Sequence, residues 1–517
     1  MSFFDQYFED KGKGGLFHVV SEDFSKVLNP EKHVDDQFTA ARTNVIGAMI
    51  SHDPETIEDA ENAVNEVIER FEDKRHGGYF LKADKDWNIV DRNKSLSEAE
   101  AIFGLLMHIY EVTKNDGYLL KALDYLDLTL KRAWDQKHGG FFSLYCEDWS
   151  KAADTKDLTT QAGMLQHLGG AWKDGIDSPF AVRAEAFKRR AESFADLILE
   201  KAADKVNGGF YTAFTGDWKP LEKEKEISQL ASLALTLYFH YHNVGPSVWG
   251  PRKGSHAYTG RPYPAVYAYR GPAPNTDPVS PKAYPYGKTV VEISDLLLEK
   301  AWDAQYGGFY TKLTEKLAPA DNRKMLSTQV AALMALNVAY RLTGYQRFRE
   351  KLIEAVRVIE DKCFDQDHGG NYTEFARDWL PLSRDKVCGP NLLMSGLMSM
   401  FAPLIDGVPV MRNTLKIWAD PPAQTIKGGK SAHVTVTLQN QGFETVKVRV
   451  GGLSAPTRWM EPPEMLVDLA PHQVTSYKLT ITPPAGLPPG PYYFELTLAP
   501  AGEVGEYVSV GGKVVVE

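Results

Sequence analysis

Two kinds of helical segment alternate along the first part of the chain. Residues Ser95–Thr113 are apolar on nearly every face, which predicts a helix buried on most sides. Residues Tyr118–Trp134 carry their charges on one side, which predicts an amphipathic helix at the surface. A Gly-Gly pair then opens two short strands, Gly140–Cys146 and one that begins at Trp149. One unit of the chain is therefore a buried helix, an exposed helix and a hairpin.

This unit recurs, because a motif of Asp, three residues and Gly-Gly occurs six times. An Asp-aromatic pair begins nine residues after the first glycine of the motif in five of the copies. A lysine comes about seventeen residues after the same glycine. A polar residue comes four or five positions after each lysine. The six motifs begin at Asp10, Asp73, Asp135, Asp204, Asp303 and Asp365. Agreement at several offsets indicates an internal repeat.

The two ends of the repeat region complement each other. The first copy has only an exposed-type helix, Ser2–Glu9, and the last has only a buried-type helix, Asn391–Ile405. Pairing these two closes a ring without the polar capping repeats that an open array needs. The sequence therefore predicts a mainly α fold over residues 1–410, an (α/α)6 toroid built of six helix-pair plus hairpin repeats. A Pro/Tyr-rich insertion at 245–286 starts on the face opposite the hairpins, and we expect packing or subunit contact from it rather than a lid.

The periodicity changes from residue 411 onward. Alternating runs such as His433–Leu438 and Tyr492–Leu498 are separated by Pro/Gly turns, which is typical of short strands. This spacing predicts a small all-β sandwich domain over residues 411–517. The pattern resembles the immunoglobulin-like accessory modules found beside carbohydrate-active domains.

Composition and charge then exclude several classes of protein. The 517 residues carry a net charge of −10 without a block of like charges, so we expect no nucleic-acid partner and no membrane partner. The N-terminus lacks a secretion-signal pattern, and no apolar run is long enough to span a bilayer. Three cysteines form no disulfide framework, which favours a reducing, cytoplasmic location. The sequence leaves open whether the chain forms a homo-oligomer through contacts of residues 245–286 or of the β-sandwich.

The predicted site is the mouth of the barrel on the hairpin side. The N-termini of the buried helices converge there, and their free N–H groups favour oxygen-rich or anionic ligands. First-turn amides would offer donors and acceptors to sugar hydroxyls, unless they instead satisfy hairpin backbone groups. The predicted substrate-binding residues are Gln37, Gln161, Gln229, Gln329, Asn391, Trp87, Tyr211 and Tyr310.

Charged residues interrupt the neutral ring in two places. Glu98 and Glu100 replace the amide in the second copy, and a carboxylate in a partly dry mouth can act as general acid or base. Arg42 lies inside an otherwise apolar helix, where a guanidinium suits a carboxylate or phosphate group. These three are the predicted catalytic residues, and the alternative is that they are capping or paired structural charges. The sequence has no evident metal-ligand cluster, phosphate loop or dinucleotide fingerprint, so we expect no cofactor and no metal.

The Asp-x-x-x-Gly-Gly-aromatic hairpin, the lysine before each buried helix and the glutamine in its first turn resemble the N-acylglucosamine 2-epimerase superfamily. The resemblance covers about Ser2–Leu404 and implies an (α/α)6 barrel that hosts sugar 2-epimerases and aldose–ketose isomerases. In that superfamily proton transfer is attributed to histidines near the mouth ends of inner helices. Here only His33 lies at a mouth, whereas His108 and His167 come later in their helices.

Three functions therefore stay open at this point. The first is a sugar-directed isomerase, epimerase or lyase that acts on a small polyhydroxylated or carboxylate-bearing substrate in the hairpin-side mouth. The second is a non-catalytic binding or assembly protein on the same toroid, which the missing histidine pair favours. The third is an enzyme on a hydrophobic, terpenoid-like substrate.

Overall fold

The structure is a computed structural model. It describes residues 6–51, 54–113, 115–175, 178–243, 284–343, 345–394, 415–421, 423–427, 429–440, 445–452, 459–462, 464–485, 489–501 and 508–517. Nearly all of the expected 245–286 insertion and parts of the two terminal barrel helices lie outside these residues. The chain divides into two compact units, which are Met1–His240 with Lys288–Asn337 and Phe348–Ala402, and Tyr241–Gly287 with Val338–Arg347 and Pro403–Glu517.

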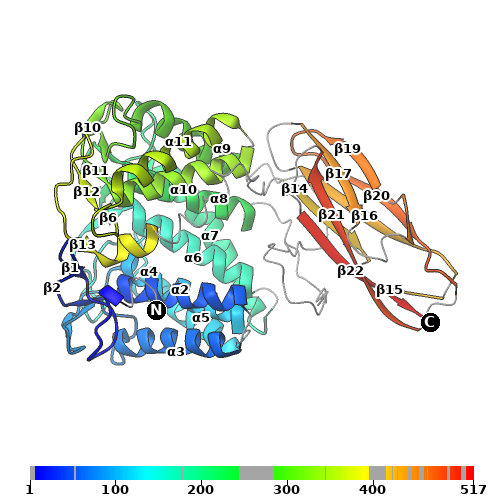
Figure 1. Cartoon of the computed structure of the whole chain (residues 1–517), viewed down its shortest axis with the longest axis horizontal. Coiled ribbons are helices and arrows are strands. Elements are labelled where there is room, and N and C mark those ends of the chain that lie inside the picture. The colour runs from blue at the N-terminus through cyan, green and yellow to red at the C-terminus, as the bar shows by residue number, and fades with distance from the viewer. Residues whose placement is uncertain are drawn as a thin grey trace. The chain divides into compact units, whose positions relative to one another are not determined.

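Helices make up most of the first unit (Figure 1). They are α2 (Val34–Ser51), α3 (Pro54–Phe71), α4 (Leu96–Thr113), α5 (Asp116–Arg132), α6 (Leu158–Gly175), α7 (Ala181–Ala202), α8 (Ile227–Asn243), α9 (Tyr284–Leu296), α10 (Leu326–Thr343) and α11 (Gln346–Cys363), and residues 388–394 are also helical. A π-helical turn, Leu297–Ala301, continues α9. Among the described helices, none is both long and apolar enough to cross a membrane.

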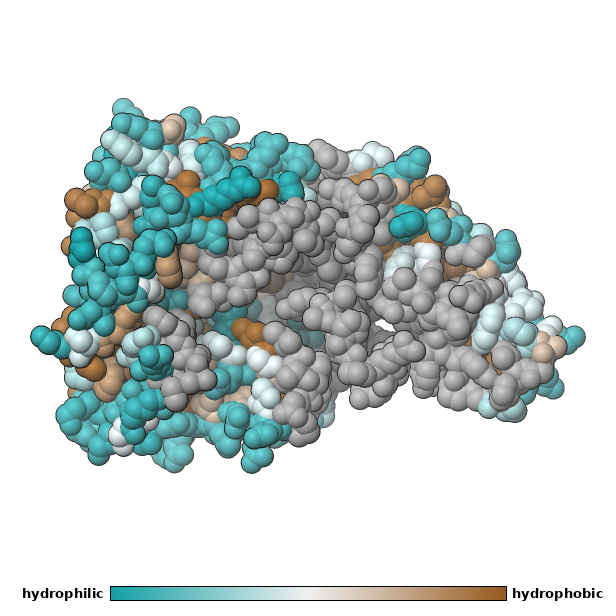
Figure 2. Space-filling view, in the orientation of Figure 1, coloured by the Kyte–Doolittle hydropathy of each residue, from teal (hydrophilic) through white to brown (hydrophobic). Residues whose placement is uncertain are grey.

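The predicted alternation of buried and exposed helices is confirmed in the helices whose packing is described. α4 packs against α2 on one side and α6 on the other, while α3, α5 and α7 pack against α2, α4 and α6 respectively. Leu105 and Ile109 of α4 are fully buried, whereas α5 buries only one face through residues such as Leu119 and Leu123. Figure 2 shows hydrophilic residues over much of the described surface of this unit in that view. The result is a helical barrel with inner and outer helices.

Short strands form the hairpins between an outer helix and the next inner helix. They are β1 (Val19–Val20), β2 (Val27–Asn29), β3 (Lys32–His33), β4 (Lys82–Ala83), β5 (Ile89–Asp91), β6 (Thr155–Asp157), β7 (Ala213–Thr215), β8 (Lys225–Glu226), β9 (Lys312–Leu313), β10 (Pro319–Asp321), β11 (Lys324–Met325), β12 (Glu374–Phe375) and β13 (Lys386–Val387). The strand that contains the repeated lysine pairs antiparallel with the next hairpin, as β3 does with β4 and β8 with β9. In the same way β13 pairs with β1, so the last repeat pairs with the first.

In five of the six motifs the second glycine leaves room for an aromatic ring from the next hairpin, whereas Gly209 is approached by Leu296 and Lys225. Gly140 has φ +79°, and a Cβ there would lie 2.6 Å from the indole of Trp218. Trp87 and Trp149 lie in the same way against Gly15 and Gly78. The hairpins are therefore held to one another by an aromatic ring that the missing Cβ admits.

Each repeated lysine is buried in its hairpin and forms an ion pair with the aspartate that begins the motif. Lys156 Nζ lies 2.7 Å from Asp135 Oδ2 and donates two further hydrogen bonds to the carbonyl oxygens of Gly139 and Gly216. Burial works against the charged Asp135 carboxylate, but the bond from Lys156 and the backbone N–H bonds from Lys137 and His138 together outweigh it, so the pKa of Asp135 is lowered. The same pair recurs at Lys32, Lys94, Lys225, Lys324 and Lys386.

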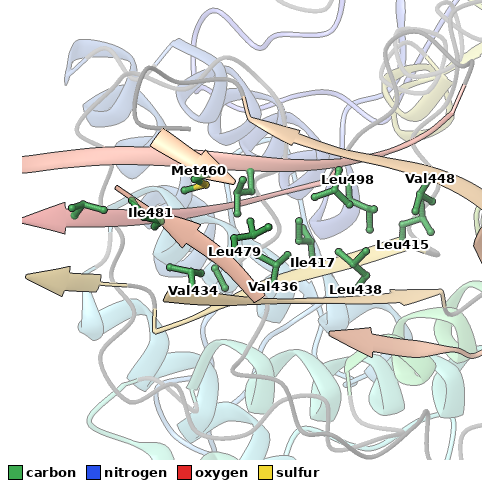
Figure 3. Close-up of a cluster of buried hydrophobic side chains, with 14 of the residues drawn as sticks. Leu415, Ile417, Val434, Val436, Leu438, Val448, Met460, Leu479, Ile481 and Leu498 are labelled. Carbon is green, nitrogen blue, oxygen red and sulfur yellow. The ribbon is translucent and has the colours of Figure 1, made fainter. Parts of the chain in front are cut away.

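In the second unit, two antiparallel-rich sheets enclose one apolar core. Their strands are β14 (Leu415–Asp420), β15 (Ala423–Ile426), β16 (Ala432–Asn440), β17 (Val446–Gly452), β18 (Met460–Glu461), β19 (Glu464–Leu469), β20 (Val474–Ile481), β21 (Gly490–Pro500) and β22 (Val508–Val516). The sheet orders are β14-β16-β20-β18 and β15-β22-β21-β17-β19. Val436 and Leu479 from one sheet and Leu498 from the other lie in this core (Figure 3).

Candidate functional site

Four of the five amides predicted to bind substrate hold the hairpins instead. Gln161 Oε1 accepts a hydrogen bond of 2.9 Å from the backbone N–H of Phe141, and its Nε2 donates one of 2.8 Å to the carbonyl oxygen of the same residue. Phe141 directly follows the Gly-Gly pair. Gln37, Gln329 and Asn391 form the matching bonds in their own repeats. With both ends of the amide engaged and buried, these side chains serve the fold.

Gln229 occupies a different position from those four amides. It comes four residues after Lys225, whereas the four clamping amides come five residues after their lysines. Its Oε1 accepts a 3.3 Å bond from the backbone N–H of Thr159 at the start of α6, and its Nε2 donates to Glu226. Asp36 and Glu98 also come four residues after their lysines. The predicted polar ring therefore contains two kinds of position, one four and one five residues after the lysine.

The three aromatic residues predicted to stack on sugars pack within and between hairpins. Trp87 Nε1 donates a 3.0 Å bond to the carbonyl oxygen of Lys13. Tyr211 donates to Glu315 at 3.4 Å, and the hydroxyl of Tyr310 accepts from Arg377 at 3.3 Å. These contacts account for the three side chains without a ligand.

The predicted catalytic residues lie on two neighbouring inner helices. Arg42 belongs to α2, while Glu98 and Glu100 belong to the first turns of α4. The side chains of Glu98 and Glu100 lie outside the described part of the structure, so their catalytic role stays a prediction. Arg42 lies close enough to His108 that its charge helps to lower the pKa of that histidine.

Two histidines on adjacent inner helices present ring nitrogens that nothing in the described part of the chain engages. These atoms are Nδ1 of His108 on α4 and Nε2 of His167 on α6. The His167 ring packs on Phe103 of α4 with ring centroids 4.4 Å apart. Burial lowers the pKa of His108 to about 4, with Arg42 adding to the effect, and burial alone lowers that of His167 to about 3. Both imidazoles are therefore neutral at pH 7.

An exposed polar residue lies next to His167 on α6. Gln166, next to His167, is exposed although α7 covers the outer side of its helix. Its Oε1 accepts a 3.4 Å bond from Thr236 of α8, so it faces another inner helix rather than the outer layer. Farther along α4 and α6, Lys173 lies 3.5 Å from Glu111. Polar groups of α4, α6 and α8 thus lie near the two histidine-bearing helices.

The sequence does contain a signal for this histidine pair, but it lies deep in the buried helices rather than in their first turns. His108 and His167 lie fourteen and eleven residues after Lys94 and Lys156, well beyond the first turn on which the mouth prediction concentrated. A polar residue deep in a helix that is apolar on nearly every face indicates a candidate functional position. His33, the histidine expected at a mouth, stacks instead on His18 of the first hairpin.

Parts of this chain are similar in sequence to known proteins. Residues 1–165 match the family described as N-acylglucosamine 2-epimerase (GlcNAc 2-epimerase). A cellobiose 2-epimerase from Bacteroides fragilis is 33% identical over 92 residues, which span 17% of this chain and 23% of that protein. The sequence match thus covers less than a quarter of that relative.

Solved structures share the fold at low identity. A cellobiose 2-epimerase from Bacillus thermoamylovorans has a TM-score of 0.61 at 15% identity, covering 77% of this chain and 95% of that one. A D-mannose isomerase gives 0.61 at 15% identity over 78% and 95% of the two chains. A family 76 glycoside hydrolase (mannosidase) from Bacteroides thetaiotaomicron gives 0.51 at 12% identity over 77% and 96%. The resemblance to the N-acylglucosamine 2-epimerase-like superfamily that the repeat motifs indicate is therefore confirmed.

Proposed function

We propose that this protein is a sugar-directed epimerase or isomerase in which His108 and His167 transfer protons and Arg42 stabilises negative charge. The observation that carries the proposal is the pair of neutral imidazoles on α4 and α6, each with a ring nitrogen free of hydrogen bonds from the described residues. The family match and the sugar epimerase and isomerase neighbours support the reaction class.

The chemistry follows from the groups at this face. Epimerisation and aldose–ketose isomerisation both begin when a base removes the proton from the carbon next to the sugar carbonyl. A neutral imidazole has the lone pair for this step, and the electrons move to the carbonyl oxygen to form an enediolate. In this proposal the guanidinium of Arg42, whose charge already acts on His108, stabilises that oxyanion. Return of the proton to the same carbon from the opposite face gives the epimer, and its return to the neighbouring carbon gives the isomer.

The test is proton exchange with solvent. The protein is incubated in D2O with a panel of aldoses, ketoses and disaccharides, and NMR follows deuterium at the carbon next to the carbonyl. Exchange should fall by about 100-fold or more in His108→Asn and His167→Asn, the scale of a lost general base. His138→Asn is the matched control, because His138 lies in a hairpin with its side chain 35% exposed. Exchange that is absent in the wild type, or unchanged in both variants, overturns the assignment.

The first-turn glutamates give a second arm of the same experiment. Glu98→Gln and Glu100→Gln should lower exchange only if one of these carboxylates shares the acid–base work, as the sequence predicts. If no sugar shows exchange while sugars raise the melting temperature, the non-catalytic binding function replaces the enzymatic one.

The finer features of the architecture belong to the same proposal. The barrel is a six-fold (α/α)6 toroid over residues 1–410, and residues 411–517 form an immunoglobulin-like module. The paired strands of the last and first hairpins support closure, and the shared core of the two C-terminal sheets supports the module. The substrate is a small molecule, and the location is cytoplasmic. Expression of residues 411–517 alone tests the module, since a separate domain should unfold cooperatively without the barrel.

A further inference from the structure

Two histidines and an aspartate meet where the first hairpin joins the start of α2. His18 Nδ1 lies 2.7 Å from Asp36 Oδ2, and the His18 and His33 rings stack with centroids 3.6 Å apart. One potential ligand atom from each of the three residues lies within 4.8 Å of the other two. His18 comes from the hairpin, His33 ends β3 and Asp36 lies in the first turn of α2, so the fold alone brings them together.

The aspartate of this cluster is buried with spare acceptor capacity. The Asp36 side chain is 0% exposed, whereas the His18 and His33 side chains are 21% and 12% exposed. Within the described part of the chain, Asp36 Oδ1 accepts no hydrogen bond of normal geometry, although Gly389 lies beside it. A buried carboxylate oxygen in this position is costly unless a donor or a cation fills it. The partly exposed imidazoles leave an entry path from solvent.

A second carboxylate orients one of the imidazoles. His33 Nε2 lies 3.0 Å from Glu31 Oε2, so Nε2 carries the proton and donates it to Glu31. That tautomer leaves the lone pair of His33 on Nδ1. Histidines that bind metals are commonly held in this way by a carboxylate on their other nitrogen.

The cluster differs from two other groups of His, Asp and Glu in the described residues. In the group of Asp73, His76 and Glu147, Lys94 already pairs with the aspartate and Arg92 with the glutamate. In the group of Glu22, Asp365 and His368, Arg384 pairs with the glutamate and Lys386 with the aspartate. Among the described residues, no lysine or arginine forms an ion pair with Asp36. The groups that favour its charged form are His18 and the backbone N–H of Gly389.

We propose that His18, His33 and Asp36 bind one divalent transition-metal ion such as Zn²⁺ or Co²⁺. Imidazole nitrogen and carboxylate oxygen suit these ions, with bonds of about 2.0–2.2 Å. Ligand atoms of a tetrahedral site with such bonds lie about 3.4 Å apart, so His18 Nδ1 and Asp36 Oδ2 need to separate by less than about 1 Å. One of the two stacked imidazole rings must also turn, so that both in-plane lone pairs point at the ion. The ion replaces the proton between them and leaves a position for water.

The ion would also join parts of the fold that meet only on closure. The backbone N–H of Cys388 donates to the carbonyl oxygen of His18, so the residue that supplies one ligand also contacts the last repeat. Metal bound to His18 and Asp36 ties the first hairpin to α2 beside this seam. The ligands are separate residues from those of the proposed reaction, since His108 and His167 lie on other helices and Arg42 lies six residues after Asp36 on α2.

The test is direct binding of Co²⁺ and Zn²⁺ to the full-length, chelator-treated protein. We expect one ion per chain, a higher melting temperature with the ion, and a Co²⁺ spectrum without thiolate charge transfer. His33→Asn should abolish this binding, and Glu31→Gln should weaken it about 10-fold or more, as loss of an orienting carboxylate does. Lys82→Gln should tighten binding, because Lys82 pairs with His33 across β3 and β4 and places a positive charge near the site.

The controls are the two other clusters and the partly exposed thiol. His76→Asn, His368→Asn and Cys146→Ser should each retain the ion. The proposal is overturned if the wild type binds no ion at micromolar concentration, or if His33→Asn and Glu31→Gln, shown folded by circular dichroism, bind as the wild type does. Deuterium exchange by the metal-free protein is measured separately, so failure of this site and failure of the sugar reaction are distinct results.

Discussion

The ring of Phe24, in the first hairpin, comes within 3.3 Å of the position that a Cβ on Gly370 would take in the sixth. Trp87 stands in the same relation to Gly15, one hairpin back along the chain. The contact of Phe24 with Gly370 is therefore the step by which the last hairpin meets the first. Phe8, Val20, Cys388 and Leu392 form a buried cluster at the same seam.

Removing the Phe24 ring should weaken this closure. Phe24→Ala takes away an aromatic side chain packed against the last hairpin, and we expect a loss of about 2 kcal/mol, below the 3–5 kcal/mol of a fully buried phenylalanine. Urea denaturation followed by circular dichroism measures it. Phe364→Ala is the matched control, because Phe364 is 45% exposed and should change the stability little. Equal stability of the two variants would show that the seam does not contribute to the barrel.

The glycines of the motif differ in what a side chain would meet. In Gly140→Ala the new Cβ would lie 2.6 Å from Trp218 and 2.8 Å from Gln161 Oε1, and the residue has φ +79°. In Gly208→Ala the φ is +83°, but no atom lies within 4 Å of the new Cβ. We expect about 1 kcal/mol from the backbone strain alone at Gly208, and several kcal/mol at Gly140, where the clash adds to it. Similar losses in the two variants would argue against the packing of Trp218 as the reason for glycine.

The spacing of the motif residues could be predicted from the sequence because contacts within one hairpin fix it. Lys156 and Asp135 must meet as an ion pair, and Gln161 must reach Phe141, so insertions between them are excluded. The same contacts give the amides a structural role that does not require a substrate. A residue repeated in every unit has a partner in every unit, and that partner is the hairpin backbone. Only the one-residue difference in offset separates Gln229 from the clamping amides.

The candidate sites were harder to predict, because they depend on which helices become neighbours. Nothing in the sequence places Arg42 beside His108, since they lie on two helices that are brought together by packing of α2 on α4. His18 and His33 likewise meet only when the first hairpin folds back on the start of α2. Residues that occur in only one copy of the motif carry no periodic signal. The candidate-site residues belong to this group.

Breaking one buried ion pair should cost more than losing an exposed one. Lys156→Met leaves Asp135 buried without its cation, and we expect a loss of about 3–5 kcal/mol. Adding Asp135→Asn should recover part of it, because the amide removes the orphaned charge and its oxygen can still accept from the N–H groups of Lys137 and His138. Lys151→Met is the control, since the pair of Lys151 with Asp154 is exposed. Chemical denaturation of the four proteins measures these differences, and no recovery in the double variant would contradict the charge explanation.

The two interior histidines should make the stability of the barrel depend on pH. Their folded pKa values, about 4 for His108 and about 3 for His167, lie below the ordinary value of 6.5. The unfolded chain therefore binds protons more readily below pH 6.5, so the unfolding free energy is full above that pH and falls as the pH drops toward 4. For His108 the loss is on the order of 3 kcal/mol. Urea denaturation at pH 7, 5.5 and 4.5 should show a smaller decline in His108→Asn than in the wild type, whereas His138→Asn should decline as the wild type does. Parallel declines in all three proteins would mean that His108 is not held neutral in the interior, and the base assigned to it would lose its physical basis.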